Sequence, residues 1–457
     1  MKLPLDVAVS ATTGRLFDAA GAPQSLRFVT DTRTLEAGDA FVALHGDRFD
    51  GHEFAGEAVR RGAALLVIDR PEVRVPGVPA MLVGETNRAY MQLAGAARER
   101  FHGRVVAITG SAGKTTTKVF LAQLLAVKYG ERVLSAPENE NNEIGVSKLL
   151  LRAESEMHDV IVAELGARHY GDVAALVAIA RPDIGILTNV GDAHVEIMGS
   201  RERLEETKWA LFGRGAGAVL NAADAASRRR AVTLGSAPHW FAAEASPRDA
   251  ALDPLTFLDG ERRLVHRRGG RCAACEVDVR VPGKHNRANL AAAMSAALEL
   301  GVSLEAIAAK VSTLRLPAGR YDRIDLASGL HLIYDAYNAN ASGMIAALDA
   351  FAAEAASRRI AVLASMAELG EESEALHERV GEHAAGLVDV LLVSGDYAAQ
   401  LARGAQRAGL GERQIVFVET NERAARWLRE HARPDDVVLL KGSRKYKLEE
   451  IVEELRA

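Results

Sequence analysis

The segment TGSAGKTTT at residues 109–117 combines small residues, a lysine and hydroxyl side chains in an order that suits phosphate binding. Its glycines let backbone N–H groups approach phosphate oxygens, because no side chain stands in the way. The lysine would lie against the β and γ phosphates, and the hydroxyl after it would reach a bound Mg2+. The residues expected to contact a nucleotide are Gly110, Ser111, Ala112, Gly113, Lys114, Thr115 and Thr116.

The spacing of the two glycines departs from the common pattern G-x-x-x-x-G-K-[ST], because only two residues separate them here. The alternative is a glycine-rich turn that joins a strand to a helix and binds nothing. The apolar run RVVAIT at 104–109 and the helical spacing of residues 116–127 favour the phosphate loop, since such loops connect a buried strand to a helix N-terminus.

Two further apolar runs end in polar clusters that could hold a metal ion and a triphosphate. Glu164 follows the first run, in VAELGARHYGD, and Asn189 and His194 follow the second, in TNVGDAHVEIMGS. Taken singly, a glutamate or histidine of this kind is more often structural. Because parallel sheets bind ligands at the carboxyl ends of their strands, the three groups together with the phosphate loop predict a Mg2+-nucleotide site.

The elements that must position these residues are those of an α/β fold with largely parallel sheets, since short apolar runs alternate with helical patterns. Around the loop, strands are expected at 104–109, 159–165 and 183–190. A second series follows residues 316–324, and a third block of strands and one short helix fills the first hundred residues. Three domains are predicted, at 1–103, 104–318 and 319–457. Further strands are expected within 31–44, 63–69, 331–340, 358–365, 388–395, 414–419 and 435–443, and helices at 56–61 and 344–356.

Composition limits the other functions. The 457 residues are 48% apolar and carry a formal net charge of -5, which gives no general attraction to nucleic acid or to an anionic membrane. The sequence has neither a signal-peptide pattern nor an apolar run of about 18 residues, so we expect a cytoplasmic protein that does not insert into a membrane. A monomer is a separate expectation. Cys272 and Cys275 lack the second ligand pair of a zinc site and are interpreted as incidental thiols.

Several longer motifs resemble the bacterial Mur ligase family, the ATP-dependent amide-forming enzymes of peptidoglycan precursor synthesis. They are ENENNEIGV, GDAHVEIMGSRERLEETK, GKHNRANLAAA, YDAYNANASGMIAAL, MAELGEESEALHERVG and VVLLKGSR. The resemblance covers essentially the whole chain and is greatest to the members that join D-alanyl-D-alanine to UDP-N-acetylmuramoyl-tripeptide. It implies an N-terminal uridine-nucleotide domain, a central ATP-binding phosphate-loop domain and a C-terminal Rossmann-like domain, and a reaction through an acyl phosphate.

The resemblance also assigns metal ligands. Glu164 and Thr115 would hold one Mg2+, and His194 with Lys208 would serve a second. The family carbamylates the lysine at the position of Lys208, which turns a cation into a carboxylate-like ligand. Without that modification, Lys208 is a lysine on a helix surface. The role implied for His194 is to stabilise the metal or the intermediate rather than to act as a general base.

Nucleotide contacts are implied on both sides of a domain boundary. Asn142 would contact the phosphates or the acceptor region, and Asn286 and Asn289 would contact adenine, although this pair could instead cap the helix that follows. Arg320 matches the arginine that reaches the γ-phosphate, and Asp335 the aspartate that binds ribose. Without the resemblance, these two are an interdomain arginine and a turn aspartate.

Substrate contacts are implied by two further segments. Thr32 and Arg33 stand at a serine-arginine pair of the uridine nucleotide-binding domain, and Asn338 and Asn340 belong to the YNAN segment near the amide-forming site. Four positions depart from the D-alanyl-D-alanine-adding pattern, namely Tyr334, Ala341, Ala210 and Ser365.

Three functions remain open. The first is the D-alanyl-D-alanine-adding ligase. The second is a divergent ligase of the same family that uses another amine or acyl acceptor, although the D-N-P-R signature of the diaminopimelate-adding members is absent. The third is a nucleotide-binding partner that has lost activity, which the retention of every candidate for phosphate and metal contact disfavours.

Overall fold

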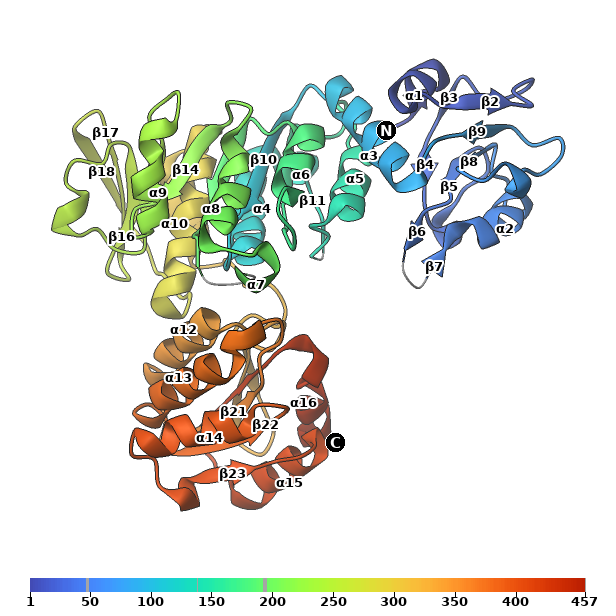
Figure 1. The fold of residues 1–457 in the computed structure, drawn as a ribbon. Coiled ribbons are helices and arrows are strands. Elements are labelled where there is room, and N and C mark those ends of the chain that lie inside the picture. The colour runs from blue at the N-terminus through green and yellow to red at the C-terminus, as the bar shows by residue number, and fades with distance from the viewer. Residues whose placement is uncertain (47–48, 138, 192–194, 457) are drawn as a thin grey trace.

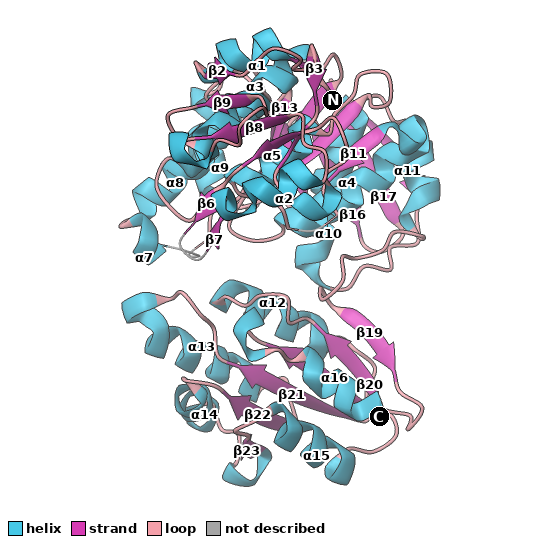
Figure 2. Ribbon diagram, turned by 90° about the vertical axis from the view of Figure 1, so that its right-hand side faces the viewer, coloured by secondary structure: helices cyan, strands magenta, loops and turns pink. Residues whose placement is uncertain are grey.

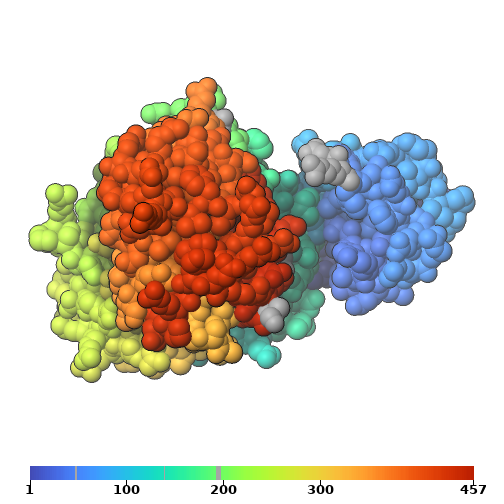
Figure 3. All heavy atoms as spheres, turned by 90° about the horizontal axis from the view of Figure 1, so that it is seen from below, coloured from blue at the N-terminus to red at the C-terminus, as the bar shows by residue number. Residues whose placement is uncertain are grey.

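The computed structural model describes residues 1–46, 49–137, 139–191 and 195–456. Three large sheets follow one another along the described chain, with five, nine and six strands, and two further pairs of strands lie in the N-terminal region. Figure 1 shows the N-terminal region beside the central one and the C-terminal region below it. Seen from below, the C-terminal residues cover much of the central region, while the N-terminal residues stand to one side (Figure 3).

The N-terminal sheet has the order β2-β9-β8-β5-β4 and is parallel apart from its edge strand β2. The strands expected within 31–44 and 63–69 and the helix expected at 56–61 are confirmed as β5, β8 and α2. The strands of this region are β1 (Leu3–Pro4), β2 (Arg15–Phe17), β3 (Ser25–Leu26), β4 (Phe28–Val29), β5 (Ala40–Val42), β6 (His45–Gly46), β7 (Phe49–Asp50), β8 (Leu65–Ile68) and β9 (Ala80–Leu82). Its helices are α1 (Leu5–Thr12), α2 (Ala55–Arg60) and α3 (Thr86–Arg100).

The central sheet has the order β11-β12-β10-β13-β14-β15-β16-β17-β18. The three strands expected around the phosphate loop are confirmed as β10, β12 and β13, which pair in parallel. The expectation of a parallel sheet missed the antiparallel edge formed by β16, β17 and β18. The strands are β10 (Arg104–Thr109), β11 (Val133–Ser135), β12 (Val160–Glu164), β13 (Ile184–Leu187), β14 (Gly217–Asn221), β15 (His239–Ala242), β16 (Leu255–Asp259), β17 (Arg263–Arg268) and β18 (Arg271–Glu276).

Successive side chains of a strand point to opposite faces of the sheet, so a strand that is apolar throughout must be covered on both faces. Helices cover both faces of this sheet. Val106 and Ile108 of β10 lie in a core with α4 and α10, whereas Val105 and Ala107 lie in a second core that extends to α3 and α5. The phosphate-loop strand is thereby fixed from both sides. The helices are α4 (Lys114–Tyr129), α5 (Glu143–Leu151), α6 (Asp172–Ala180), α7 (Val195–Met198), α8 (Arg201–Trp209), α9 (Ala225–Arg230), α10 (Gly283–Glu299) and α11 (Leu304–Val311).

The C-terminal sheet has the order β19-β20-β24-β21-β22-β23, and only the pairing of β19 with β20 is antiparallel. The five strands expected here are confirmed, and the helix expected at 344–356 starts and ends a few residues earlier, as α12. Figure 2 shows helices on both sides of this sheet. The elements are β19 (Asp322–Asp325), β20 (His331–Tyr334), β21 (Arg358–Ala364), β22 (Val390–Ser394), β23 (Ile415–Phe417), β24 (Asp436–Lys441), α12 (Ala341–Ala352), α13 (Ser373–Ala385), α14 (Ala398–Arg407), α15 (Asn421–His431) and α16 (Glu449–Arg456).

The fold brings two sets of strand ends together. The carboxyl ends of β10, β12 and β13 share one edge of the central sheet, and those of β20, β21 and β24 share one edge of the C-terminal sheet. Polar residues that follow these strands therefore meet at the junction of the two regions. No helix formed by the described residues combines the length and apolar character that crossing a bilayer requires.

Candidate nucleotide site

A cavity of about 810 Å3 lies between the central and C-terminal regions. Its central wall is formed by the phosphate loop, the ends of β12 and β13 and the start of α10. Its C-terminal wall is formed by the segments around residues 320, 335–343 and 441–445. The candidate residues that line it are Ser111, Ala112, Gly113, Lys114, Thr115, Thr116, Glu164, Asn189, Asn286, Asn289, Arg320, Asp335, Asn338 and Asn340.

The phosphate loop has a backbone that only glycine adopts readily at two positions. Gly110 has φ 150° and Gly113 has φ 82°. A Cβ atom on Gly113 would lie 2.2 Å from Oδ1 of Asn289, so the loop and α10 pack without room for a side chain. Asn189 holds the loop from the β13 side, because its carbonyl accepts from Ser111 N at 3.1 Å and its Oδ1 accepts from Ala112 N at 3.1 Å.

Lys114 lies folded over this loop. Its Nζ donates to the carbonyl of Gly110 at 2.8 Å, so the ammonium is held over the concave side where phosphate oxygens would lie. Burial lowers the pKa of Lys114, the carboxylate of Glu164 opposes that shift, and the cation Arg320 adds to it. Two cations that face one cavity repel each other, and an anionic ligand would relieve that repulsion.

Glu164 ends β12 with its side chain 2% exposed. Its Oε1 accepts from Asn141 Nδ2 at 2.8 Å. When the amide of Asn139 is turned so that its nitrogen faces Glu164, this Asn139 nitrogen donates to the same Oε1 at 2.6 Å. In this orientation the same nitrogen of Asn139 lies 3.4 Å from the hydroxyl of Thr115. A buried carboxylate and a hydroxyl thus both lie next to the Asn139 amide beside the phosphate loop, and oxygen ligands of this kind suit Mg2+.

Lys118 is a buried cation that sequence reasoning did not single out. It lies one turn after Lys114 on α4, its side chain is 1% exposed, and its Nζ stands 4.0 Å from Oε2 of Glu164. The same Nζ donates to the carbonyl of Ala136 at 2.9 Å. Lys118 therefore helps to balance the charge of Glu164, and it is not among the residues that line the cavity.

Lys208 is buried, and the alternative that it is a helix-surface lysine is wrong. It lies on α8 with 1% of its surface exposed. Burial, followed by the charge of Lys114, lowers the pKa of Lys208 to about 7, while Asp172 opposes the shift. Its partner in the predicted second metal site, His194, lies outside the described residues.

Two asparagines of α10 face the cavity. Asn286 and Asn289 are buried within the helix, which begins at Gly283 with Pro282 as its N-cap residue. The alternative that this pair caps the helix is therefore wrong. His285 lies beside them, with its Nδ1 buried and unpaired among the described residues, and burial lowers its pKa to about 4.

The C-terminal wall carries Arg320 and Asp335. The guanidinium of Arg320 lies 4.6 Å from the centre of the Tyr337 ring, and its buried Nε has no hydrogen-bond partner among the residues described. Asp335 follows β20, and its Oδ2 lies 2.9 Å from Nζ of Lys441, a side chain only 3% exposed. The same ammonium donates to the carbonyl of Asp335 at 3.0 Å and contacts that of Asn338 at 3.4 Å. Lys441 thus fixes the loop that follows β20.

The remaining candidates occupy three different places. Asn338 and Asn340 line the cavity, and Oδ1 of Asn340 also caps α12 by accepting from Gly343 N at 2.8 Å. Asn142 caps α5 by accepting from Gly145 N at 2.9 Å and does not line the cavity, whereas the preceding Asn141 does. Thr32 and Arg33 lie in the N-terminal region, outside the residues that line this cavity.

The two residues of the N-terminal region that are predicted to contact the substrate, Thr32 and Arg33, lie in different environments. Thr32 is buried, and its hydroxyl donates to Oε1 of Glu57 at 3.2 Å. Arg33 is 82% exposed and pairs with Asp31 at 2.7 Å. The hydrogen bonds from Arg33 hold the pKa of Asp31 at about 2, so this carboxylate stays charged.

The departures from the resembled pattern take up local roles. The hydroxyl of Tyr334 donates to Oε2 of Glu449 at 3.1 Å, and Ala341 is the first residue of α12. Ser365 is buried, donates to the carbonyl of Ser394 at 3.1 Å and accepts from Tyr397 N at 2.8 Å. Ala210 directly follows α8. None of these four lines the cavity.

Comparison with known proteins now adds to the geometry. Three family models match successive parts of the chain: the Mur ligase family catalytic domain at 28–98, the Mur ligase middle domain at 108–297 and the Mur ligase glutamate ligase domain at 319–444. UDP-N-acetylmuramoyl-tripeptide--D-alanyl-D-alanine ligase of Escherichia coli is 35% identical over 462 residues, which cover 98% of this chain and 99% of the relative. The chain belongs to the Mur ligase family. The enzyme of the same name from Bacillus subtilis is 32% identical to this Mur ligase, over 93% of this chain and 92% of the relative.

Solved structures agree with this assignment of the fold. MurF from Acinetobacter baumannii matches this Mur ligase with a TM-score of 0.86 and 28% identity, over 100% of this chain and 99% of that one. MurF from Thermotoga maritima, solved in complex with ADP, matches with a TM-score of 0.80 and 28% identity, over 94% and 97% of the two chains. The predicted fold class, with three Mur ligase regions and parallel sheets, is confirmed.

Proposed function

We propose that this Mur ligase joins D-alanyl-D-alanine to UDP-N-acetylmuramoyl-tripeptide in peptidoglycan precursor synthesis and uses ATP to do so. The observation that carries the proposal is the cavity in which the phosphate loop and Glu164 face Arg320 and Asp335. The Escherichia coli relative, which aligns over almost the whole chain, carries that activity in its name. The domain limits that we propose remain 1–103, 104–318 and 319–457.

The chemistry explains why ATP is needed. A carboxylate does not react with an amine at neutral pH, because oxide is too poor a leaving group. The carboxylate of the muramoyl peptide attacks the γ-phosphorus of ATP, ADP leaves, and an acyl phosphate forms. The amine of the dipeptide then attacks the acyl carbon, and the tetrahedral intermediate expels phosphate to give the amide.

The two walls contribute different groups to the first step. Lys114 and the backbone N–H groups of the loop offset the charge of the β and γ phosphates, while Arg320 approaches from the other wall. Asp335 would accept hydrogen bonds from the ribose, and Asn286 with Asn289 would contact the adenine. These groups hold the carboxylate of the muramoyl peptide close to the phosphates of ATP. The repulsion between these two anions is the largest electrostatic obstacle to the attack.

The oxygen-rich cluster fits Mg2+. Glu164 and Thr115 would hold one ion, and the amides of Asn139 and Asn141 orient the carboxylate. A bound Mg2+ supplies positive charge to the phosphate oxygens.

Lys208 fits the proposal of a carbamylated lysine for a second ion, with His194 as a further ligand. Only a neutral amine adds to carbon dioxide, and a buried lysine with a pKa of about 7 is partly neutral at physiological pH. A carbamate would also replace the repulsion between Lys208 and Lys114 by attraction.

The N-terminal region would hold the uridine nucleotide of the acceptor. Thr32 and Arg33 lie together at the start of one turn, η1 (Thr32–Thr34), and the exposed guanidinium could meet a diphosphate. In this arrangement the central wall activates a carboxylate delivered from the N-terminal region.

The decisive experiment measures phosphate release from ATP by the purified chain with UDP-N-acetylmuramoyl-tripeptide and a panel of amines. We expect release that depends on D-alanyl-D-alanine and on the muramoyl peptide. Release with a single amino acid but not with the dipeptide would instead identify a divergent ligase. An absence of release with every amine, despite ADP binding, would identify an inactive nucleotide-binding partner.

A further inference from the structure

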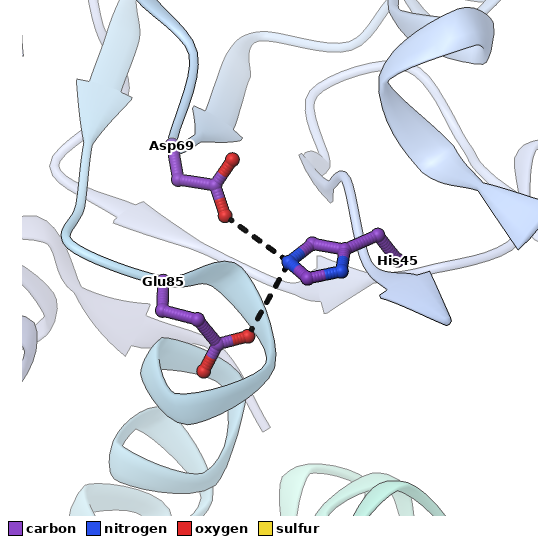
Figure 4. Close-up of side chains that lie close together, drawn as sticks. All are labelled: His45, Asp69 and Glu85. Atoms are coloured by element: carbon purple, nitrogen blue, oxygen red, sulfur yellow. Dashed lines mark ion pairs between the residues drawn. The ribbon is translucent and has the colours of Figure 1, made fainter. Parts of the chain in front are cut away.

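Three side chains of the N-terminal region converge on one point outside the nucleotide site. They are His45 on β6, Asp69 directly after β8, and Glu85, the N-cap residue of α3. Figure 4 shows the imidazole pointing between the two carboxylates. Nε2 of His45 lies 3.5 Å from Oδ2 of Asp69 and 3.6 Å from Oε1 of Glu85, and the three ligand atoms lie within 4.8 Å of one another.

These distances do not describe ordinary hydrogen bonds. An N–H···O bond has a heavy-atom separation of about 2.7–3.2 Å, so both contacts of His45 are too long. Two carboxylates that approach a single imidazole also repel each other, and this repulsion costs stability unless a cation lies between them. The two carboxylates therefore supply negative charge that a bound cation would offset.

The same distances suit a tetrahedral metal ion. With metal–ligand bonds of about 2.0–2.2 Å, two ligand atoms of a tetrahedral site lie about 3.3–3.6 Å apart. One imidazole nitrogen and two carboxylate oxygens form a donor set that binds divalent ions of the zinc class. Among the described residues, this is the one group of three histidine, cysteine or acidic side chains whose ligand atoms all lie within 4.8 Å of one another.

The carboxylates are oriented by hydrogen bonds from behind. Oδ2 of Asp69 accepts from Thr86 N at 3.0 Å, and the two carboxylate oxygens of Glu85 accept from Asn87 N at 2.8 Å and Arg88 N at 2.6 Å. A carboxylate oxygen accepts two bonds, so each keeps a lone pair for a metal.

A buried histidine supports the site from its inner side. Nε2 of His52, whose side chain is 2% exposed, accepts from the backbone N–H of Asp69 at 3.3 Å and lies 3.1 Å from the second carboxylate oxygen of that residue. Its Nδ1 lies 2.8 Å from Oδ1 of Asp50. The backbone of His45 is fixed as well, because the Asn87 side chain bonds to both its N–H and its carbonyl. Such outer contacts fix the orientation of metal ligands.

We propose that His45, Asp69 and Glu85 bind one divalent transition-metal ion of the zinc class. Asp69 is 11% exposed, whereas His45 and Glu85 are 38% and 42% exposed, so a fourth coordination position opens toward solvent. The ion would join β6 and the end of β8 to the start of α3. Because α3 packs against α5 and α6 of the central region, the ion would stabilise the junction between the two regions.

The test uses the full-length chain, stripped of metal and kept in Mg2+, and measures Zn2+ binding by calorimetry. We compare it with His45→Ala and with Glu85→Gln, which keeps the capping oxygen of α3 but removes the charge. The matched control is His331→Ala, since His331 also pairs with an aspartate, Asp325, at 2.6 Å on an exposed edge. Zinc that binds to Cys272 and Cys275 or near Glu164 is common to all four proteins and cancels in the comparison.

We expect the wild type and His331→Ala to bind one more equivalent of Zn2+ than His45→Ala. The affinity for that equivalent should fall about tenfold or more in Glu85→Gln, as is typical when a metal site loses part of its ligand support. Zinc should raise the unfolding temperature of the wild type more than that of either site variant. Equal stoichiometry and affinity in wild type, His45→Ala and Glu85→Gln would overturn the proposal and leave the cluster as a set of helix-capping carboxylates beside a histidine.

Discussion

The two walls of the nucleotide cavity are built differently. The central wall is held by hydrogen bonds that run within it, from Asn189 to the loop and from Asn141 to Glu164. In the C-terminal wall, a buried cation, Lys441, ties Asp335 and the following loop to β24. Helices α10 and α12 pack against each other between the walls, and a Cβ on Gly283 would lie 2.8 Å from that of Ala350.

This difference assigns separate tasks to the walls. The central wall is preorganised for phosphate, so it should bind a nucleotide without the C-terminal wall. Arg320 can reach that nucleotide only when the C-terminal wall is close, and closure would also exclude water from the acyl phosphate. Nucleotide binding should therefore depend mainly on the central wall, whereas the rate of the reaction should depend on both walls.

The largest effect is expected from the central wall. Lys114→Ala removes the cation that Gly110 holds over the phosphate site, so phosphate release should fall by about 10³-fold or more with every amine. The matched control is Lys128→Ala on the same helix, because Lys128 Nζ bonds to the carbonyl of Leu300, away from the loop. A Lys114→Ala enzyme that keeps a tenth of the wild-type rate would rule out the role given to this wall.

The next effect separates the walls. Arg320→Ala should lower kcat by about 10²-fold, because it removes charge stabilisation of the transferred phosphoryl group. ADP affinity, measured by calorimetry, should change much less. Arg323→Ala is the control, since Arg323 pairs with Glu354 at 2.7 Å on the outer strand β19. If ADP binding were lost and kcat unchanged, Arg320 would be a binding residue and the comparison of the walls would fail.

A smaller effect is expected within the C-terminal wall. Lys441→Met leaves the carboxylate of Asp335 buried without its partner, which should lower the free energy of unfolding by about 2 kcal/mol. The double variant Lys441→Met/Asp335→Asn should recover part of that loss, because it removes the unpaired charge. Lys445→Met is the control, since its pair with Asp396 is exposed. Urea unfolding of these four proteins and of Asp335→Asn measures the coupling, and a double variant no more stable than Lys441→Met would contradict it.

The central wall could be predicted more fully than the C-terminal wall from sequence. The apolar runs of β10, β12 and β13 and the glycines of the loop are local signals, and Glu164 and Asn189 follow directly from where those strands end. The pairing of Lys441 with Asp335 joins residues 106 positions apart, so no local pattern reveals it. Its only signal is a lysine that ends an apolar strand, in VVLLKGS.

Other features escaped prediction for physical reasons. Strands β17 and β18 lie at a sheet edge and carry charged or exposed residues, as in RLVHRR, so they lack the apolar run of a buried strand. Asn141 bonds to Glu164, whereas Asn142 caps α5, and the sequence ENENN does not distinguish two adjacent asparagines. The burial of Lys208 depends on what packs over α8, whose own composition is mostly polar.

The smallest effect reports the distance between the walls. His285 belongs to α10, and its burial lowers its pKa to about 4 from an ordinary value of 6.5. Two charges of the other wall also act on this pKa: Asp335 raises it and Lys441 lowers it. As pH falls from 6.5 toward 4, the unfolded chain takes up the proton first, so this histidine lowers the free energy of unfolding by about 1 kcal/mol per pH unit near pH 6. His285→Asn should flatten that slope relative to His102→Asn, an exposed histidine that serves as control. Should the walls stand apart in solution, His285 would be hydrated, the two variants would show the same slope, and its imidazole would titrate near 6.5 by NMR.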